Sequence, residues 1–330
     1  MDHPVRLRLA VAALAATAVV IATGGRAEAI AHGSAVPDGQ YAFAVKLSDF
    51  GIPIAGGGKR DSACSGGLIS PHWVLTAGHC FRDAHGKRVS RVVASRTTVT
   101  VGRTDLTGAD GHTATVVAVR QNGTADVALA RLDTAVTDIR PMKIARSKPQ
   151  VGESVRLTGF GQTTPTGSTL PQRLQTGRFK ISSVAKLTVG MVGTSPKSDT
   201  SPCPHDSGGP YFTEAADGTA TVVGVVSHGP DCPHTGPDTA ARIDAIGSWI
   251  QSVIGSDLAA PSPSARPSPS PSFARAAPPP ADPHPGPPFW LLIPIGALVG
   301  VVVLFTLGGR SDRHRGVHRG RRGVPRQPVR

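Results

Sequence analysis

Cys203-Pro204-His205-Asp206-Ser207-Gly208-Gly209-Pro210 is the stretch of sequence that decides the fold. Its serine follows an aspartate and precedes two glycines, in a turn that the cysteine can hold in place. Such a turn presents a hydroxyl group and surrounds it with backbone N–H groups. A serine hydroxyl is a poor nucleophile at neutral pH, so it needs a base and a group that orients the base. The stretch therefore indicates a nucleophile whose partners come from elsewhere in the chain.

Two upstream motifs supply these partners: Thr76-Ala77-Gly78-His79-Cys80 and Ala125-Asp126-Val127-Ala128-Leu129. Taken alone, the histidine has an ordinary explanation as a core residue, and the aspartate as a turn residue. In the order His79, Asp126, Ser207, the three motifs resemble the chymotrypsin/trypsin family of serine endopeptidases, in its bacterial secreted type. The resemblance covers residues 30–255.

The sequence also indicates an all-β domain. Val, Thr and Gly are common and aromatic residues make up only 4% of the chain. Short runs at residues 96–101 and 219–226, with turn residues at 107–111 between them, predict antiparallel strands. Apolar residues at helical spacing predict a helix at 243–254. The resemblance sharpens this to two antiparallel six-stranded β-barrels with a C-terminal helix, and it implies no cofactor.

The resemblance implies a role for each motif. Ser207 attacks a peptide carbonyl, His79 accepts and later donates the proton, and Asp126 orients the imidazole. The backbone amides of His205 and Ser207 form the oxyanion hole. His205 stands where the family usually has glycine, so a rival hypothesis remains open: a catalytically impaired binding protein on the same fold. A surface stalk would explain only the C-terminal quarter of the chain.

Further residues are expected to contact the substrate, a peptide or protein. Ser227 matches the serine that supports the triad aspartate, and His228, followed by Gly229, replaces the usual tryptophan. Ser201 falls at the floor of the specificity pocket, which favours neutral side chains. Asp238 falls at the pocket wall, where it attracts a basic side chain, fills the pocket or points to water. These alternatives stay open.

The N-terminus predicts export. Residues 1–29 combine early arginines, an apolar run at 9–22 and a small-x-small site ending at Ala29, as in a signal peptide. A retained anchor is the alternative, but the run is short for a membrane span. Cleavage would free Ile30, whose ammonium, by resemblance, pairs with Asp206.

The four cysteines fit an oxidising compartment. By resemblance, Cys64 pairs with Cys80 and Cys203 with Cys232. A metal site is not expected, because no C-x-x-C pair is present. A zinc site or pH switch formed by His79, His205 and His228 is conceivable, but solvated histidines are the favoured interpretation.

The C-terminal part predicts a membrane tether. Residues 256–288 are rich in Pro, Ser and Ala, which is typical of a semi-stiff linker. Residues 289–307 carry no charge and are long enough to span a bilayer as a helix. The tail at 308–330 holds eight arginines and one aspartate, more than half of the net charge of +13. Its position favours a cytoplasmic C-terminus over nucleic-acid binding. The predicted location is the cell membrane, with the catalytic domain outside.

Overall fold

The computed structural model describes residues 29–166 and 171–258. The predicted linker, membrane helix and basic tail lie outside these residues, as does all of the predicted signal peptide except Ala29. Within the described ranges, no helix has the length and apolar character that a membrane span requires.

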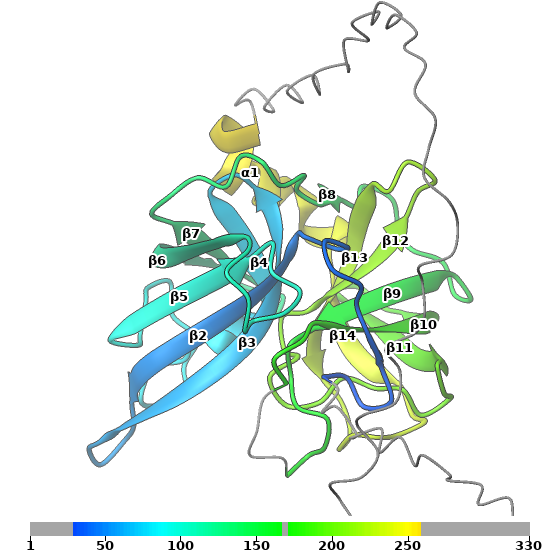
Figure 1. Cartoon of the computed structure of the whole chain (residues 1–330), viewed down its shortest axis with the longest axis horizontal. Coiled ribbons are helices and arrows are strands. Elements are labelled where there is room, and N and C mark those ends of the chain that lie inside the picture. Colours follow the sequence, from blue (N-terminus) through cyan, green and yellow to red (C-terminus); the bar gives the residue numbers. More distant parts are fainter. Residues whose placement is uncertain (1–28, 167–170, 259–330) are drawn as a thin grey trace, which may run out of the picture. The chain divides into compact units, whose positions relative to one another are not determined.

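Six antiparallel strands close the first barrel in the order β2-β3-β4-β7-β6-β5 (Figure 1). Their bounds are β2 (Ala44–Pro53), β3 (Lys59–Ser70), β4 (Trp73–Thr76), β5 (Arg96–Val101), β6 (His112–Gln121) and β7 (Ala128–Leu132). Alternate residues point inward, so that Val99 and Val101 of β5 are fully buried while Arg96 is exposed. The strand predicted at 96–101 is confirmed.

A second group of six strands closes in the order β9-β10-β11-β14-β13-β12, with β12 and β10 both pairing with β9. Their bounds are β9 (Ser154–Gly159), β10 (Gln175–Val184), β11 (Thr188–Ser195), β12 (Pro210–Glu214), β13 (Ala220–His228) and β14 (Asp238–Arg242). Two short strands lie at its margin: β1 (Ser34–Ala35) pairs with β10, and β8 (Lys143–Ile144) runs parallel to β13. The two predicted barrels are therefore confirmed.

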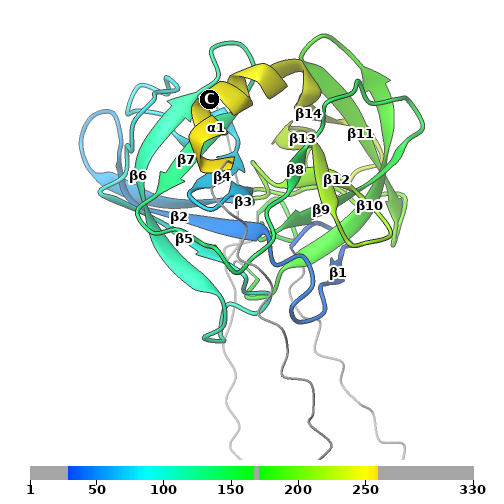
Figure 2. The same cartoon turned by 90° about the horizontal axis from the view of Figure 1, so that it is seen from above.

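The closing helix begins later than the sequence pattern indicated. A 3-10 helix, η2 (Asp244–Ile246), precedes α1 (Gly247–Leu258), which extends past the predicted end at 254. Ile246, Ile250 and Ile254 are buried at intervals of four residues, which is the apolar stripe of a helix that packs on a core. Asp257 accepts a hydrogen bond from the backbone N–H of His72, so the helix that follows the second barrel packs on the first (Figure 2).

An aromatic cluster joins the two barrels. The ring of Phe212 on β12 lies 5.2 Å, centroid to centroid, from both Tyr41 and Phe43, which lead into β2. Both contacts are edge-to-face, the geometry that aromatic rings prefer. The barrels are therefore packed against each other through a shared apolar core.

Candidate active site

The Ser207 loop enters β12 between the two barrels. Gly208 has φ +86, and a β-carbon on it would lie 2.1 Å from Thr76 Oγ1 and 2.3 Å from the carbonyl oxygen of Ser65. Only glycine permits both the left-handed backbone and this close approach to the first barrel. The Cys203–Cys232 disulfide ties the start of the loop to the segment between β13 and β14.

His79 lies on the 3-10 helix η1 (Gly78–Cys80), directly after β4. The Cys64–Cys80 disulfide joins this turn to β3. Both predicted disulfides are confirmed. Gly78 is also constrained, since a β-carbon there would lie 2.6 Å from Gln121 Oε1 and 3.1 Å from Asp126 Oδ1. The turn is thereby held close to Asp126.

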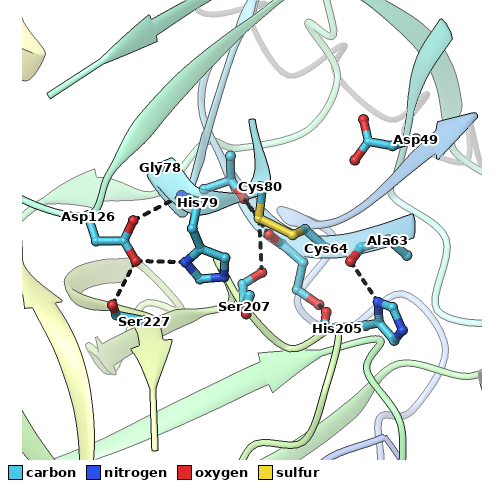
Figure 3. Close-up of a disulfide and its surroundings, with 12 residues drawn as sticks. Asp49, Ala63, Cys64, Gly78, His79, Cys80, Asp126, His205, Ser207 and Ser227 are labelled. Carbon is cyan, nitrogen blue, oxygen red and sulfur yellow. Dashed lines mark hydrogen bonds and ion pairs between the residues drawn. A yellow bond between two sulfur atoms is a disulfide. The ribbon is translucent and has the colours of Figure 1, made fainter. Parts of the chain in front are cut away.

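Asp126 holds His79 through both carboxylate oxygens. Its Oδ1 accepts the backbone N–H of His79 at 2.9 Å, and its Oδ2 lies 2.7 Å from Nδ1 of the ring. Since a carboxylate only accepts, Nδ1 carries the proton, and in the neutral ring Nε2 is free to act as a base. Figure 3 shows the His79 ring between Asp126 and Ser207.

Two further side chains hold Asp126 in place. Ser227 Oγ donates to Oδ2 at 2.7 Å, and Arg88 lies 3.4 Å from Oδ1 while donating to the carbonyl oxygen of Ala125 at 2.7 Å. Burial raises the pKa of the Asp126 carboxyl. The hydrogen bond and charge of His79, together with the hydrogen bond of Ser227, outweigh this effect and hold the pKa below its ordinary value. Asp126 therefore stays ionised beside the imidazole.

The predicted oxyanion-hole residues flank Asp206. His205 is half-buried and has φ +74, a conformation that side chains other than glycine rarely adopt. Within residues 29–166 and 171–258, no protein group accepts a hydrogen bond from the backbone N–H of His205 or Ser207. Two donors next to the serine hydroxyl are thus available to a developing negative charge.

Asp206 is completely buried behind the loop. Its carboxylate accepts backbone N–H groups from Gly161 at 2.8 Å, from Cys203 at 2.9 Å and from Ile30. Burial nevertheless raises its pKa to about 7. Ile30 is also fully buried, and its neighbour Ala31 pairs with Ser201. The structure brings the two residues of the predicted N-terminal ion pair into contact.

The remaining residues that were predicted to contact the substrate lie in the two segments that the Cys203–Cys232 disulfide joins. Ser201 is fully buried, while His228 and Gly229 are exposed at the end of β13. Asp238 is only 2% exposed, so the alternative that it points to water is wrong. A β-carbon on Gly229 would lie 2.0 Å from Asp238 Oδ1, so this carboxyl lies against the exposed end of β13.

His234 is the neighbour of Asp238 that the sequence did not indicate. Its Nε2 lies 3.2 Å from Asp238 Oδ1, although the atoms are not aligned for a hydrogen bond. Burial, assisted by the charge of Asp206, raises the pKa of Asp238 to about 8. The Asp238 carboxyl is therefore mostly protonated, rather than a bare negative charge, at neutral pH.

The three histidines of the conceivable zinc site have separate partners. Nδ1 of His205 contacts the carbonyl oxygen of Ala63, and Nδ1 of His228 lies 3.2 Å from Ser227 Oγ. In the described part of the chain, no group of three or more His, Cys, Asp or Glu residues is arranged to hold a metal ion.

Comparison with known proteins identifies the family. The model of the family described as Trypsin matches residues 30–250. The chain belongs to the trypsin family. Among curated trypsin-like relatives, kallikrein-8 of Rattus norvegicus is 26% identical over 208 residues, which is 58% of this chain and 77% of the relative. Snake venom serine protease 3 of Protobothrops jerdonii is 28% identical over 216 residues, covering 61% and 81%.

Several residues of this trypsin-family site escaped the sequence interpretation. Arg88, Ser65 and His234 carry no motif of their own. Arg88 and Ser65 contact Asp126 and Phe160, which lie 38 and 95 residues away, whereas His234 lies against Asp238 within the same segment. Ser227, in contrast, was predicted from the sequence, through its place in Val226-Ser227-His228-Gly229.

Proposed function

We propose that residues 30–255 form a serine endopeptidase that hydrolyses peptide bonds through an acyl-enzyme. The observation that carries the proposal is the His79–Asp126 pair, bonded through both carboxylate oxygens, with Ser207 on the other side of the ring. Family membership supports a peptide or protein as the substrate.

Each side chain has a definite part in the reaction. The Ser207 oxygen attacks the peptide carbonyl while Nε2 of His79 takes its proton. Asp126 keeps the other proton on Nδ1 and stabilises the imidazolium that forms. The N–H groups of His205 and Ser207 donate to the oxygen that becomes negative. His79 then protonates the leaving amine, and water releases the acyl group by the same steps.

The Ile30 segment adds a requirement for processing. In the unprocessed chain, Asp206 faces a neutral backbone N–H of Ile30. Cleavage after Ala29 would replace this donor with an ammonium group, which pairs with the buried carboxylate and stabilises the Ser207 loop. Signal peptidase would then produce the active form without a separate propeptide. N-terminal sequencing of the secreted protein tests this step, since any start other than Ile30 contradicts it.

Diisopropyl fluorophosphate tests the catalytic proposal. The processed wild-type protein should lose activity and gain one covalent label, whereas Ser207→Ala should take up none. Ser62→Ala, an exchange of a serine on β3 that leaves the three side chains intact, serves as the matched control and should label normally. Absence of labelling in a correctly processed wild type would instead favour the impaired binding protein.

The location is part of the same proposal. We place the enzyme outside the cell, held by residues 289–307 with residues 308–330 in the cytoplasm, on the charge pattern of the sequence. Cell fractionation tests this: the full chain should sediment with membranes, and a chain that stops at residue 258 should appear in the medium. A full chain released into the medium with residues 289–307 intact would contradict the tether.

A further inference from the structure

His205 combines two features that the proposed mechanism does not explain. Its backbone is left-handed, at φ +74, although its β-carbon disfavours that region. Its half-buried side chain turns toward Ala63 of the first barrel, as Figure 3 shows. In the stretch 203–210, it is the only residue other than glycine with a positive φ.

The imidazole makes a specific contact across the barrel interface. Nδ1 of His205 lies 2.8 Å from the carbonyl oxygen of Ala63 on β3. A carbonyl oxygen only accepts, so Nδ1 must carry a proton. It does so both in the Nδ1–H tautomer of the neutral ring and in the imidazolium. Protonation of the ring therefore leaves this hydrogen bond intact.

The same short piece of β3 holds the backbone on either side of Asp206. Ser65 Oγ donates to the carbonyl oxygen of His205 at 3.2 Å, and Ser65 N donates to the carbonyl oxygen of Ser207 at 2.9 Å. Ser65 Oγ is itself held by the N–H of Phe160 at 2.9 Å. Cys64, between Ala63 and Ser65, is bonded to Cys80 beside His79. Residues 63–65 thus connect the oxyanion loop, the nucleophile and the base.

We propose that the His205 side chain is a positioning residue, whose Nδ1–H bond to Ala63 tethers the oxyanion loop to β3. The tether holds the amides of His205 and Ser207 in the orientation that stabilises the negative oxygen. This inference rests on the proposed endopeptidase function. The histidine therefore does not disable the oxyanion hole. A glycine would reach this backbone conformation freely, whereas His205 is held in it by the bond from its side chain to the first barrel.

Three variants separate the tether from other effects. His205→Asn keeps a donor nitrogen at the place of Nδ1 and tolerates a positive φ. His205→Asp has the same shape but presents only acceptors when ionised. His205→Ala lacks the donor without adding charge. Each variant is purified with both disulfides formed, and its melting temperature is compared with that of the wild type.

Peptide hydrolysis gives the first readout. Losing one whole oxyanion donor costs ~10²–10³ in kcat, so we expect kcat to fall at least about tenfold in the Ala and Asp variants, with KM within about twofold and the Asn variant within about threefold of wild type. Equal kcat in all four proteins would overturn the tether while leaving the proposed function standing. A loss confined to the Asp variant would show that charge, not the donor, matters, and would also overturn it. A His205→Asn variant whose kcat is as low as that of His205→Ala would also overturn the tether.

The second readout does not depend on activity. Long-range ¹H–¹⁵N correlation spectra of the Ser207→Ala protein should show the neutral ring of His205 in its Nδ1–H tautomer. The Nε2–H tautomer would overturn the proposal whatever the kinetics show. If the wild type neither hydrolyses peptides nor reacts with diisopropyl fluorophosphate, the proposed function fails, and the tautomer still decides whether the bond to Ala63 exists.

Discussion

Burial of Asp206 makes the stability of the unprocessed chain fall as pH rises. The carboxyl is fully buried and accepts three backbone N–H groups, yet burial raises its pKa to about 7. An aspartate in an unfolded chain titrates near pH ~3.9. Between these two values, the native state binds more protons than the unfolded state. The free energy of unfolding therefore decreases with rising pH in this window and is constant above it.

The size of the effect follows from the shift. A difference of about three pKa units at roughly 1.4 kcal/mol each amounts to about 4 kcal/mol. This contribution is fully present below about pH 4 and is lost by about pH 7. In a chain that begins at Ile30, we expect an ammonium to face the carboxylate and its charge to lower the pKa of Asp206. The stabilisation should then be present at neutral pH and be lost on acidification.

Guanidinium unfolding between pH 4 and pH 8 measures this difference. Chains of residues 26–258 and 30–258 are compared, each with Ser207→Ala to prevent self-cleavage, and each with and without Asp206→Asn. In the longer chain, the free energy of unfolding with Asp206, relative to that with Asn at this position, should fall by about 4 kcal/mol from pH 4 to pH 8. In the shorter chain, it should grow over the same range. The same pH dependence in both chains would refute the reasoning.

Three other perturbations give independent tests. Asp126→Asn should leave folding intact but lower kcat toward peptide p-nitroanilides by roughly 10⁴, because an amide allows the wrong imidazole tautomer; a loss under tenfold would contradict the role of Asp126. Phe212→Ala removes the central ring of the cluster between the barrels and should lower the free energy of unfolding in urea by about 3–5 kcal/mol. The control, Val117→Ala at an exposed position, should lower it by about 0.5 kcal/mol or less. Replacing Cys203 and Cys232 together by serine opens a link across 29 residues and should cost about 3–4 kcal/mol; an unchanged denaturation midpoint would argue against the bridge.

Local patterns carried the fold prediction. The alternation at 96–101 predicted a strand because neighbouring side chains of a strand face opposite sides, and β5 spans those residues. The helix pattern at 243–254 was less exact. Ile243 and Ile246 have helical spacing, but Asp244–Ile246 form a 3-10 turn that precedes the α-helix. The last turn of the α-helix reaches Leu258. There, Asp257 is held by His72, 185 residues away, a contact that no window of sequence can reveal.

The site residues also divide into those that local motifs indicated and those that only the structure explained. His79, Asp126 and Ser207 each lie in a local motif, so their residue types and order indicated their chemistry. His205 was conspicuous only as a departure from glycine. The sequence favoured a solvated ring and left a disabled oxyanion hole open as the rival hypothesis. Its bond to Ala63, which spans 142 positions, changes that interpretation. Asp238 likewise had three open alternatives, of which burial against the end of β13 removed one.

The sequence alone determined the pattern of strands, the turn that presents Ser207 and the identity of the chemical groups, because these depend on residue type and short-range spacing. Tertiary structure decided which carboxyl is desolvated and which backbone is held, as in Asp206 beneath the Ser207 loop and His205 against β3. The physical reason is that desolvation and hydrogen bonding act over a few ångströms in space, between segments that the chain separates by a hundred residues or more.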